Sequence, residues 1–474
     1  MRFFVARSRM TPAPGFRTVA LIIASAMFME QLDGTILATA LPAMAESFDV
    51  SPLHMSVALT SYMLSLAVFI PASGAIADRY GSRNVFRTAI ALFTLGSILC
   101  GVSGNLTLLV LSRLLQGIGG AMMVPVGRLV LLRSVPKSEL VSAMSWLLVP
   151  ALIGPVVGPP LGGFIVTWAS WRWIFYINVP IGIAGMWLAT KYIPDVRLPD
   201  KVRFDRLGFV LSGVSLSCLV FGLEMVSHGV TSFYSSTGLI AGGLLVGTLY
   251  VWHSRRVEHP ILDLSLMRFT TFRLSVVAGS LTRITAGSVP FLLPLMMQLG
   301  FGLSAAHSGV VTFVSALGAM LMKATAAPVL RMWGFRSTLV WNGVLSMVCV
   351  ALCAAFRPDW PLWTIYAVLL LSGFFQSLQF SAYNTVAYAD VPSERFSAAT
   401  SFYTTFQQLM LSLGICVASA ALHASVAWHG RENAQLPDFS VAFLVVTFVS
   451  LVAAPVCALL PRNAGAEMSG HRAR

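Results

Sequence analysis

Long apolar segments separated by short polar connections run through the whole chain. Each apolar segment holds about 20 residues, the length that a helix needs to cross roughly 30 Å of hydrocarbon. We therefore predict an all-α polytopic membrane protein with fourteen spans, an even number that places both termini on one side. The predicted spans cover residues 18–41, 55–77, 85–104, 106–132, 140–167, 173–193, 207–227, 237–253, 273–300, 306–330, 337–356, 361–388, 396–424 and 439–460.

The spans fall into two blocks of six that flank two extra spans. The connections on either side of the extra pair are the longest and most polar in the chain. We predict an N-terminal six-helix bundle over 1–193, two extra helices with linkers over 194–271, and a C-terminal six-helix bundle with a short tail over 272–474. The turn Tyr80–Arg83 is echoed by Trp333–Arg336 in the later block. Such repeated halves are typical of transporters that hold their substrate midway across the bilayer.

Composition and charge agree with this class. Apolar residues make up 57% of the chain and charged residues only 10%, whereas soluble domains carry about 25% charged residues. Of the 31 Lys and Arg residues, 24 lie on one predicted side, four lie within spans, and three (Arg172, Arg357 and Arg431) lie opposite. This asymmetry predicts that both termini are cytoplasmic. The net charge of +13 is then a topology signal and an attraction to membrane lipids, with no nucleic acid as partner.

The connection between the second and third spans carries glycines and charges at a distinctive spacing. Gly81 permits a tight reversal of the chain. Asp78 beside basic residues can form a clasp that one conformation makes and another breaks, although a plain basic turn would also satisfy the topology rule. The candidate residues of this conformational switch are Gly74, Asp78, Arg79, Gly81 and Arg83.

This connection resembles motif A of the major facilitator superfamily, and further segments extend the resemblance over the whole chain. Leu32–Pro42 resembles the first-span signature of the fourteen-span drug:proton antiporter family, and Arg113–Gly120 resembles motif B. Gly154–Gly163 resembles motif C, and Trp171–Gly182 is typical of the same family. The resemblance implies a proton-driven efflux antiporter of the inner membrane that works by alternating access, with a monomer sufficient for transport.

Motif C implies export by antiport in the resembled family. We expect its glycines and prolines to let the fifth span pack closely against the opposite half and bend there. Close packing without any directional meaning is the alternative. The residues concerned are Gly154, Pro155, Gly158, Pro159, Gly162 and Gly163.

Asp33 is the predicted site of proton coupling. An ionised carboxylate at mid-span costs about 2.5–3.5 kcal/mol, so its protonation should depend on whether water reaches it. Glu30 lies three residues earlier on the same helical face and either titrates together with Asp33 or packs at a helix interface. Arg113 within the fourth span needs a counter-charge, and the resemblance to motif B assigns it to proton or substrate handling. A purely structural hydrogen bond is the alternative for Asp33.

Further polar residues within spans are candidates for a substrate cavity, or for hydrogen bonds between helices. They are Gln116, Arg128, Arg283, Gln298, Gln376 and Asn384. We expect Lys323 and Arg128 to extend to a membrane interface. Glu224 lies in an extra span and is assigned either to the cavity or to lipid headgroups. With Glu224 included, the predicted spans contain four basic and three acidic side chains. This excess of positive charge favours a second hypothesis, export of an organic acid or an anionic metal chelate.

Other classes of function lack support in the sequence. No P-loop, HExxH motif or nucleophile elbow is present, which argues against an enzyme or an ATP-driven pump. The six cysteines lie within spans and are expected to be small buried hydrophobes. The eight histidines are scattered, so we predict no metal site and no cofactor. The predicted partners are a small-molecule substrate, protons and lipids, and the sequence leaves the oligomeric state open.

Overall fold

The computed structural model describes residues 16–134, 140–193, 204–228, 233–392, 395–431 and 433–469. Within these ranges the chain forms helices and turns and no strand, which confirms the predicted all-α class. The predicted cytoplasmic termini, the start of the predicted insert at 194–203 and Lys137 between spans four and five lie outside the described residues.

The six predicted N-terminal spans are confirmed, and we call the helices that form them the N half. The first span continues through a 3₁₀ turn into a short helix at its far end. The sixth is preceded by a single helical turn. Their bounds are α1 (Phe16–Ile36), α2 (Leu41–Phe48), α3 (Ser56–Tyr80), α4 (Ser82–Val102), α5 (Leu106–Ser134), α6 (Leu140–Trp168), α7 (Trp173–Tyr176) and α8 (Asn178–Tyr192).

The extra pair and the last six spans follow, and we call the helices after the pair the C half. The pair consists of α9 (Arg206–His228) and α10 (Phe233–Ser254). The C half consists of α11 (Thr270–Leu295), α12 (Ala305–Cys353), α13 (Leu362–Val386), α14 (Phe396–Trp428), α15 (Leu436–Leu451), α16 (Ala453–Ala458) and the short α17 (Ala466–Ser469).

The similar segments Tyr80–Arg83 and Trp333–Arg336 form a corresponding glycine turn in each half. Gly81 joins α3 to α4 with φ 87°. Gly334 interrupts the long helix α12 with φ 68°, so that α12 covers two predicted spans. Positive φ is costly for residues with a Cβ atom. Both reversals therefore depend on glycine, as the sequence echo predicts.

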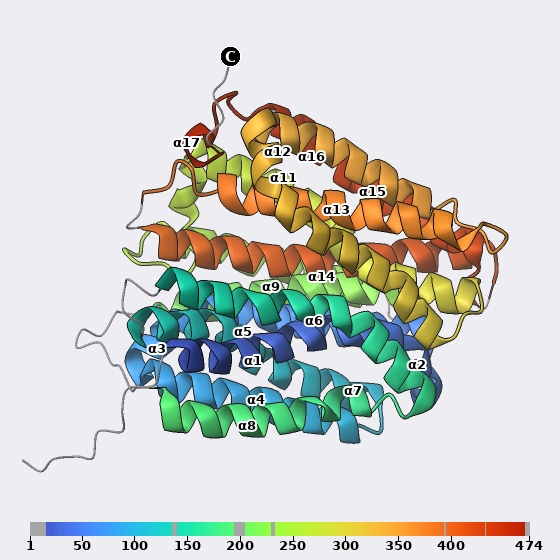
Figure 1. The fold of residues 1–474 in the computed structure, drawn as a ribbon, viewed down its shortest axis with the longest axis horizontal. Coiled ribbons are helices and arrows are strands. Elements are labelled where there is room, and N and C mark those ends of the chain that lie inside the picture. Colours follow the sequence, from blue (N-terminus) through green and yellow to red (C-terminus); the bar gives the residue numbers. More distant parts are fainter. Residues whose placement is uncertain are drawn as a thin grey trace, which may run out of the picture.

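The two halves lie side by side, with the N half below and the C half above in Figure 1, and α9 packs on both where α3 meets α14. We call the ends of the spans near Arg79, Arg83 and Arg336 the inner end, and those near Arg172 and Arg357 the outer end. Each half has its own hydrophobic core. A third core joins the halves at the outer end, and it contains Ile36, Leu37 and Leu41 together with Phe291 and Leu295 of α11. The halves are therefore closed against each other at the outer end.

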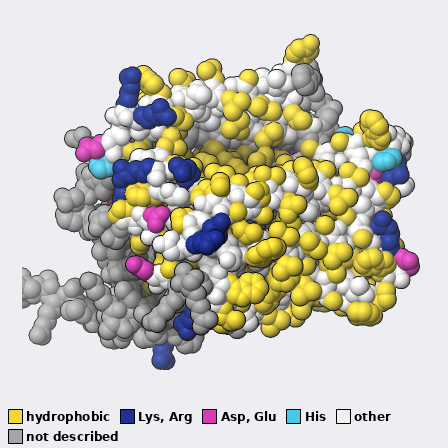
Figure 2. All heavy atoms as spheres, turned by 90° about the horizontal axis from the view of Figure 1, so that it is seen from above, with side chains coloured by type: hydrophobic (Ala, Val, Ile, Leu, Met, Phe, Trp, Pro, Cys, Tyr) yellow, Lys and Arg dark blue, Asp and Glu magenta, His cyan; other side chains and the backbone are white. Residues whose placement is uncertain are grey.

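The surface fits a lipid environment. In Figure 2 most charged side chains gather toward the two ends of the molecule, and the face between them is mainly hydrophobic. Large apolar residues such as Trp187, Trp341 and Phe448 are exposed on spans, which would be unfavourable in water. Thirteen helices in the described ranges are long and apolar enough to cross a membrane, and Ile153–Trp168 within α6 is a shorter apolar helix. The chain is a multi-pass membrane protein.

Small residues set how closely the spans approach. A Cβ atom on Gly119 of α5 would lie 2.5 Å from the backbone N of Phe93 on α4. One on Gly287 of α11 would lie 2.1 Å from the backbone O of Leu411 on α14. Helices in membranes gain much of their association energy from such close packing.

We predict that Gly119→Ala destabilises the protein by about 1–3 kcal/mol, because the added methyl group overpacks the contact between α4 and α5. Gly238→Ala is the matched control, since its added methyl group would have no described atom within 4 Å. Thermal unfolding in detergent measures both variants. Equal midpoints for the two would contradict the packing argument.

Candidate functional site

A buried ion pair forms the centre of the N half. Asp33 lies on α1 and Arg113 on α5, and their side chains are 1% and 0% exposed. Arg113 Nη1 lies 2.5 Å from Asp33 Oδ2. Removing both charges from water is costly, and only mutual attraction with further hydrogen bonds offsets that cost. The two residues therefore form one unit.

Three more polar side chains complete the network around Asp33. Gln116 Nε2 donates to Asp33 Oδ1 at 2.8 Å, and Asn178 Nδ2 donates to the same oxygen at 3.1 Å. Gln116 also accepts from Arg113 Nη1 at 2.7 Å and donates to Ser97 Oγ at 2.9 Å. The network thus ties α1, α4, α5 and α8 together through one carboxylate.

Helix α3 contacts the guanidinium group of Arg113 on another side. Arg113 Nε donates to the backbone O of Ala58 at 3.1 Å, and the guanidinium carbon lies 4.2 Å from the centre of the Tyr62 ring. An aromatic face attracts a desolvated cation. The side chain of Arg113, which extends from α5, is therefore held against α3, and the Asp33 carboxylate is its charge partner.

Asn178 is a member of this network that the sequence interpretation did not single out. It lies at the start of α8, within the segment Trp171–Gly182 that is typical of the resembled family. An amide side chain in an otherwise apolar span needs a partner. That signal was present in the sequence, but it did not identify Asp33 as the partner.

Glu30 connects the neighbourhood of Asp33 to a cavity. Its side chain is 7% exposed, and its Oε2 accepts from Gln31 Nε2 at 2.7 Å. Gln31 in turn lines the cavity. A carboxyl group one helical turn from Asp33 is thus only one side chain away from the cavity wall.

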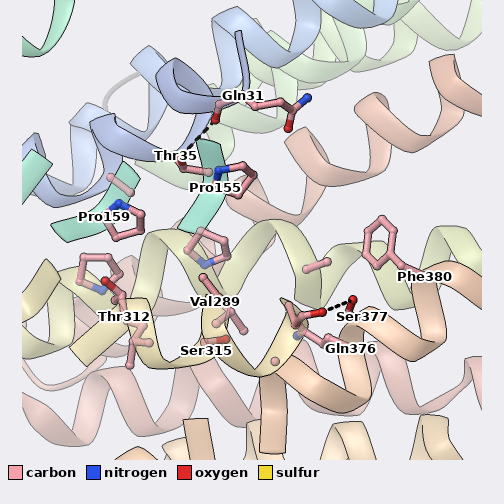
Figure 3. A pocket seen from close by; sticks show the side chains of 18 of the residues that line it. Gln31, Thr35, Pro155, Pro159, Val289, Thr312, Ser315, Gln376, Ser377 and Phe380 are labelled. Carbon is pink, nitrogen blue, oxygen red and sulfur yellow. Dashed lines mark hydrogen bonds between the residues drawn. The ribbon is translucent and has the colours of Figure 1, made fainter. Parts of the chain in front are cut away.

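The cavity lies between the two halves and has a volume of about 500 Å³, within the range of about 300–1,000 Å³ usual for small-molecule sites. Figure 3 shows Gln31 and Thr35 of α1 with Pro155 and Pro159 of α6 on one side, facing side chains of α11, α12 and α13. Most of the wall is apolar. Among the described residues that line it, the only charged side chain is Lys323.

Lys323 lines the cavity, and its Nζ donates to Ser381 Oγ at 3.1 Å. Its side chain is exposed, so the expected extension to a membrane interface stays a prediction. The sequence alone does not reveal which residues share the cavity wall, because it does not show which face of a span meets the other half.

The six predicted cavity residues occupy different places. Gln376 lines the cavity, whereas Gln116 is buried in the Asp33 network. Gln298 Nε2 donates to the backbone O of Thr39 at the outer end, at 3.1 Å. Arg128 is exposed on α5 and is not among the residues of the cavity wall.

Arg283 and Asn384, the remaining two, meet within the C half. Arg283 is 3% exposed, and its Nη2 donates to Asn384 Oδ1 at 3.1 Å, Tyr403 Oη at 2.9 Å and Gln407 Oε1 at 3.2 Å. Its guanidinium also lies 5.1 Å from the ring of Phe380, a cavity residue. These three oxygens are neutral, so Arg283 adds positive potential behind the cavity wall.

Motif C packs on both halves: α6 lies against α12 of the C half, as the sequence predicts, and also against α1 of its own half. Cβ atoms on Gly154, Gly158 and Gly162 would lie 2.1–3.0 Å from atoms of α1. Gly163 alone of these glycines meets the C half, where its Cβ would lie 2.3 Å from the backbone O of Ala305. Pro155 and Pro159 line the cavity. Motif C therefore places α6 against the helix that carries Asp33.

The switch residues lie at the inner end. Gly81 makes the turn, Asp78 is half-buried, and Arg79 is exposed. Arg83 Nη1 lies 3.5 Å from the backbone O of Ile193, the residue that follows α8. A Cβ added to Gly74 would have no described atom within 4 Å, so close packing does not require glycine there.

Glu224 also differs from the expectation. The sequence assigned it to the cavity or to lipid headgroups, but its side chain is 3% exposed between helices and is not part of the cavity wall. In the described ranges, no three side chains of His, Cys, Asp or Glu come together to hold a metal ion.

Comparisons with known proteins agree on the family. The profile of the Major Facilitator Superfamily matches residues 23–415 and 275–472. MdtD of Escherichia coli O157:H7, provisionally described as a multidrug resistance protein, is 38% identical over 445 residues, covering 93% of this chain and 94% of MdtD. MdtD of Salmonella paratyphi A is 40% identical, covering 92% of each chain.

A solved structure supports the fold. A point mutant of the nucleoside transporter NupG superposes with a TM-score of 0.63 at 15% identity, covering 93% of this chain and 98% of NupG. At this identity the likeness concerns the fold alone.

We predict that Arg113→Gln lowers the free energy of unfolding by about 3–5 kcal/mol, because it leaves the buried Asp33 carboxylate without a counter-charge. Asp33→Asn should also destabilise. The double variant should lose less than the sum of the two, and a double-mutant cycle from unfolding in detergent measures this coupling. Asp359→Asn, at an exposed outer-end loop, is the control for a lost carboxylate. Strictly additive losses would argue against a coupled pair.

Proposed function

Since the chain belongs to the major facilitator superfamily of transporters, we propose that it is a proton-driven antiporter that exports small molecules across the inner membrane. The observation that carries this proposal is the buried pair of Asp33 and Arg113 beside a cavity between the halves. The names of its MdtD relatives support drugs or similar compounds as substrates.

The proposed coupling step is protonation of Asp33. While Asp33 is ionised, its attraction to Arg113 holds α1 to α5. A proton on the carboxyl group removes that attraction and leaves Arg113 to its bonds with Gln116 and Ala58. Such a loss of a buried charge partner is worth several kcal/mol, enough to shift α1 relative to the rest of the N half.

Glu30 and Gln31 form the proposed proton route. Gln31 contacts both the cavity and Glu30, and Glu30 lies one turn from Asp33 on α1. Water that fills the cavity in one conformation reaches Asp33 through this pair. One proton moving inward down about 100 mV releases about 2.3 kcal/mol, equivalent to roughly a fifty-fold gradient of a neutral solute.

Alternating access requires the halves to rock about the cavity. The shared outer-end core closes the cavity from one side, so opening it means separating Ile36 and Leu41 from Phe291 and Leu295. The proposed moving units are residues 1–193 and 272–474, with 194–271 as the insert, and the motif A turn at Gly81 serves as the inner-end switch. Both termini are proposed to be cytoplasmic.

A second candidate function is export of an organic acid or an anionic metal chelate by the same mechanism. Lys323 favours it, because this ammonium group is the only charge among the described residues lining the cavity. Arg283 lies behind Phe380 and adds to the positive potential. An organic cation would meet a like charge in this cavity, whereas an anion would meet a counter-charge.

We predict that Asp33→Asn abolishes uphill export, so that the accumulation ratio falls to about one, because a neutral amide carries no proton. Proteoliposomes with an imposed proton gradient and a panel of lipophilic dyes measure this. Asp359→Asn should behave as wild type. Wild-type uphill export by a variant with both Asp33→Asn and Glu30→Gln would contradict the coupling assignment.

We predict that Lys323→Gln lowers transport of naphthalenesulfonate by about tenfold, a loss of about 1.4 kcal/mol, while Lys323→Arg retains it. Naphthyltrimethylammonium has the same ring and the opposite charge, and its transport should not fall. Lys191→Gln, at the inner end, is the control. Equal losses for both probes would speak against a role of Lys323 in charge selection.

A further inference from the structure

A buried carboxyl group outside the Asp33 network joins three parts of the molecule. Glu224 lies on α9, one turn before its outer end. Its Oε1 accepts from Ser56 Oγ at 2.5 Å, and its Oε2 accepts from Cys416 Sγ at 2.9 Å. Ser56 begins α3 of the N half, and Cys416 belongs to α14 of the C half. One side chain of the insert thus contacts both halves.

The packing of α9 supports such a bridging role. This helix packs on α3 and on α14, which also pack on each other. Toward the inner end, the rings of Phe209 and Phe69 lie 5.5 Å apart, so α9 follows α3. Helix α10 packs on α9 and exposes Leu245 and Trp252 on its outside. Within the insert, α9 is therefore the helix that contacts both moving halves.

The two donors distinguish the ionised from the protonated carboxyl group. An ionised carboxylate accepts hydrogen bonds on both oxygens, whereas a protonated one has turned one oxygen into a donor. The protonated oxygen no longer accepts a hydrogen bond, so Glu224 then binds either Ser56 or Cys416 less strongly. A thiol is a weaker donor than a hydroxyl group, so the bond from Cys416 to Glu224 is the one that protonation releases first.

We propose that Glu224 is a second proton-binding carboxyl group, which latches α14 to α3 and α9 at the outer end while ionised and releases α14 when protonated. The inference deepens the proposed transport function and rests on it, since it assumes that the halves separate at the outer end. The same stretches of the packed helices carry other titratable side chains: His54, Tyr62, Cys218, Tyr234, Cys416 and His423.

Hydrogen–deuterium exchange of the full-length protein in lipid nanodiscs tests the latch. The segments to follow are residues 52–60 and 412–422, which contain the two donors. In the wild type, exchange there, corrected for its intrinsic pH dependence, should rise as the pH is lowered from alkaline to acidic, because protonation of Glu224 removes an acceptor oxygen. The Asp33 network is present in every variant compared, so its contribution cancels.

Glu224→Gln resembles the protonated state, because an amide offers one acceptor oxygen. Its outer-end exchange should be about threefold faster than in the wild type at high pH, the effect of one average interhelical hydrogen bond in a membrane. The difference should disappear at low pH. Ser212→Ala is the matched control, since Ser212 is buried on the same helix and its hydroxyl donates to the backbone O of Phe209 within that helix.

Two variants at Cys416 keep the test decisive if Glu224→Gln does not fold. Cys416→Ala removes the link to α14 and should raise exchange in 412–422 at high pH. Cys416→Ser keeps a donor and should restore wild-type exchange. Exchange at high pH in Glu224→Gln or Cys416→Ala that equals that of Ser212→Ala would overturn the latch. If Asp33→Asn still abolished uphill export in that case, only the latch would be wrong. If Asp33→Asn exported as the wild type does, the proposed function would be overturned.

Discussion

The structure depends on burying one carboxylate, Asp33, in the middle of an apolar bundle. Neither Asp33 nor Arg113 is stable alone in that position, so four helices are arranged to bring their polar groups to one point. The close approach of α4 to α5 serves this arrangement: a Cβ on Gly96 would lie 2.6 Å from Cβ of Gln116. Motif C serves it too, because its glycines let α6 lie directly against α1. The order of the N half is thus built around a single titratable group.

The two halves differ in charge, and that difference would suit the proposed antiport. The N half contains a matched acid and base, whereas the C half contains Arg283 among neutral oxygens and Lys323 on the cavity wall. In the proposed mechanism, a proton that neutralises Asp33 would act on the N half alone. A substrate anion that pairs with Lys323 would change the C half alone. Proton and substrate can therefore act on opposite sides of the same cavity, and their effects meet where the halves touch.

Local patterns predicted the fold, because span length, basic residues and turn glycines are properties of short segments. The fourteen spans and the matched turns at Gly81 and Gly334 follow from them. The partners within the site were less accessible. Asn178, Lys323 and Glu224 are each a polar residue in an apolar span, and the sequence gives no sign of which neighbouring helix each one faces. Asp33 could be singled out because a mid-span carboxylate is costly wherever it points, while Asn178 could be placed only once α8 was known to pack against α1 and α4.

The inserted helices α9 and α10 do more than add apolar surface to the protein. If α9 and α10 only widened the apolar surface, α9 would need no polar residue toward its partners, and Val or Leu at position 224 would pack at less cost. Instead α9 carries a carboxyl group to the junction of α3 and α14, and donors from both halves meet it there. A hydrogen bond to only one half would anchor the insert there, and a movement between the halves would leave that bond unchanged. Because Glu224 touches both, the proposed rocking of the halves would change its hydrogen bonds and would involve the insert in the proposed transport cycle.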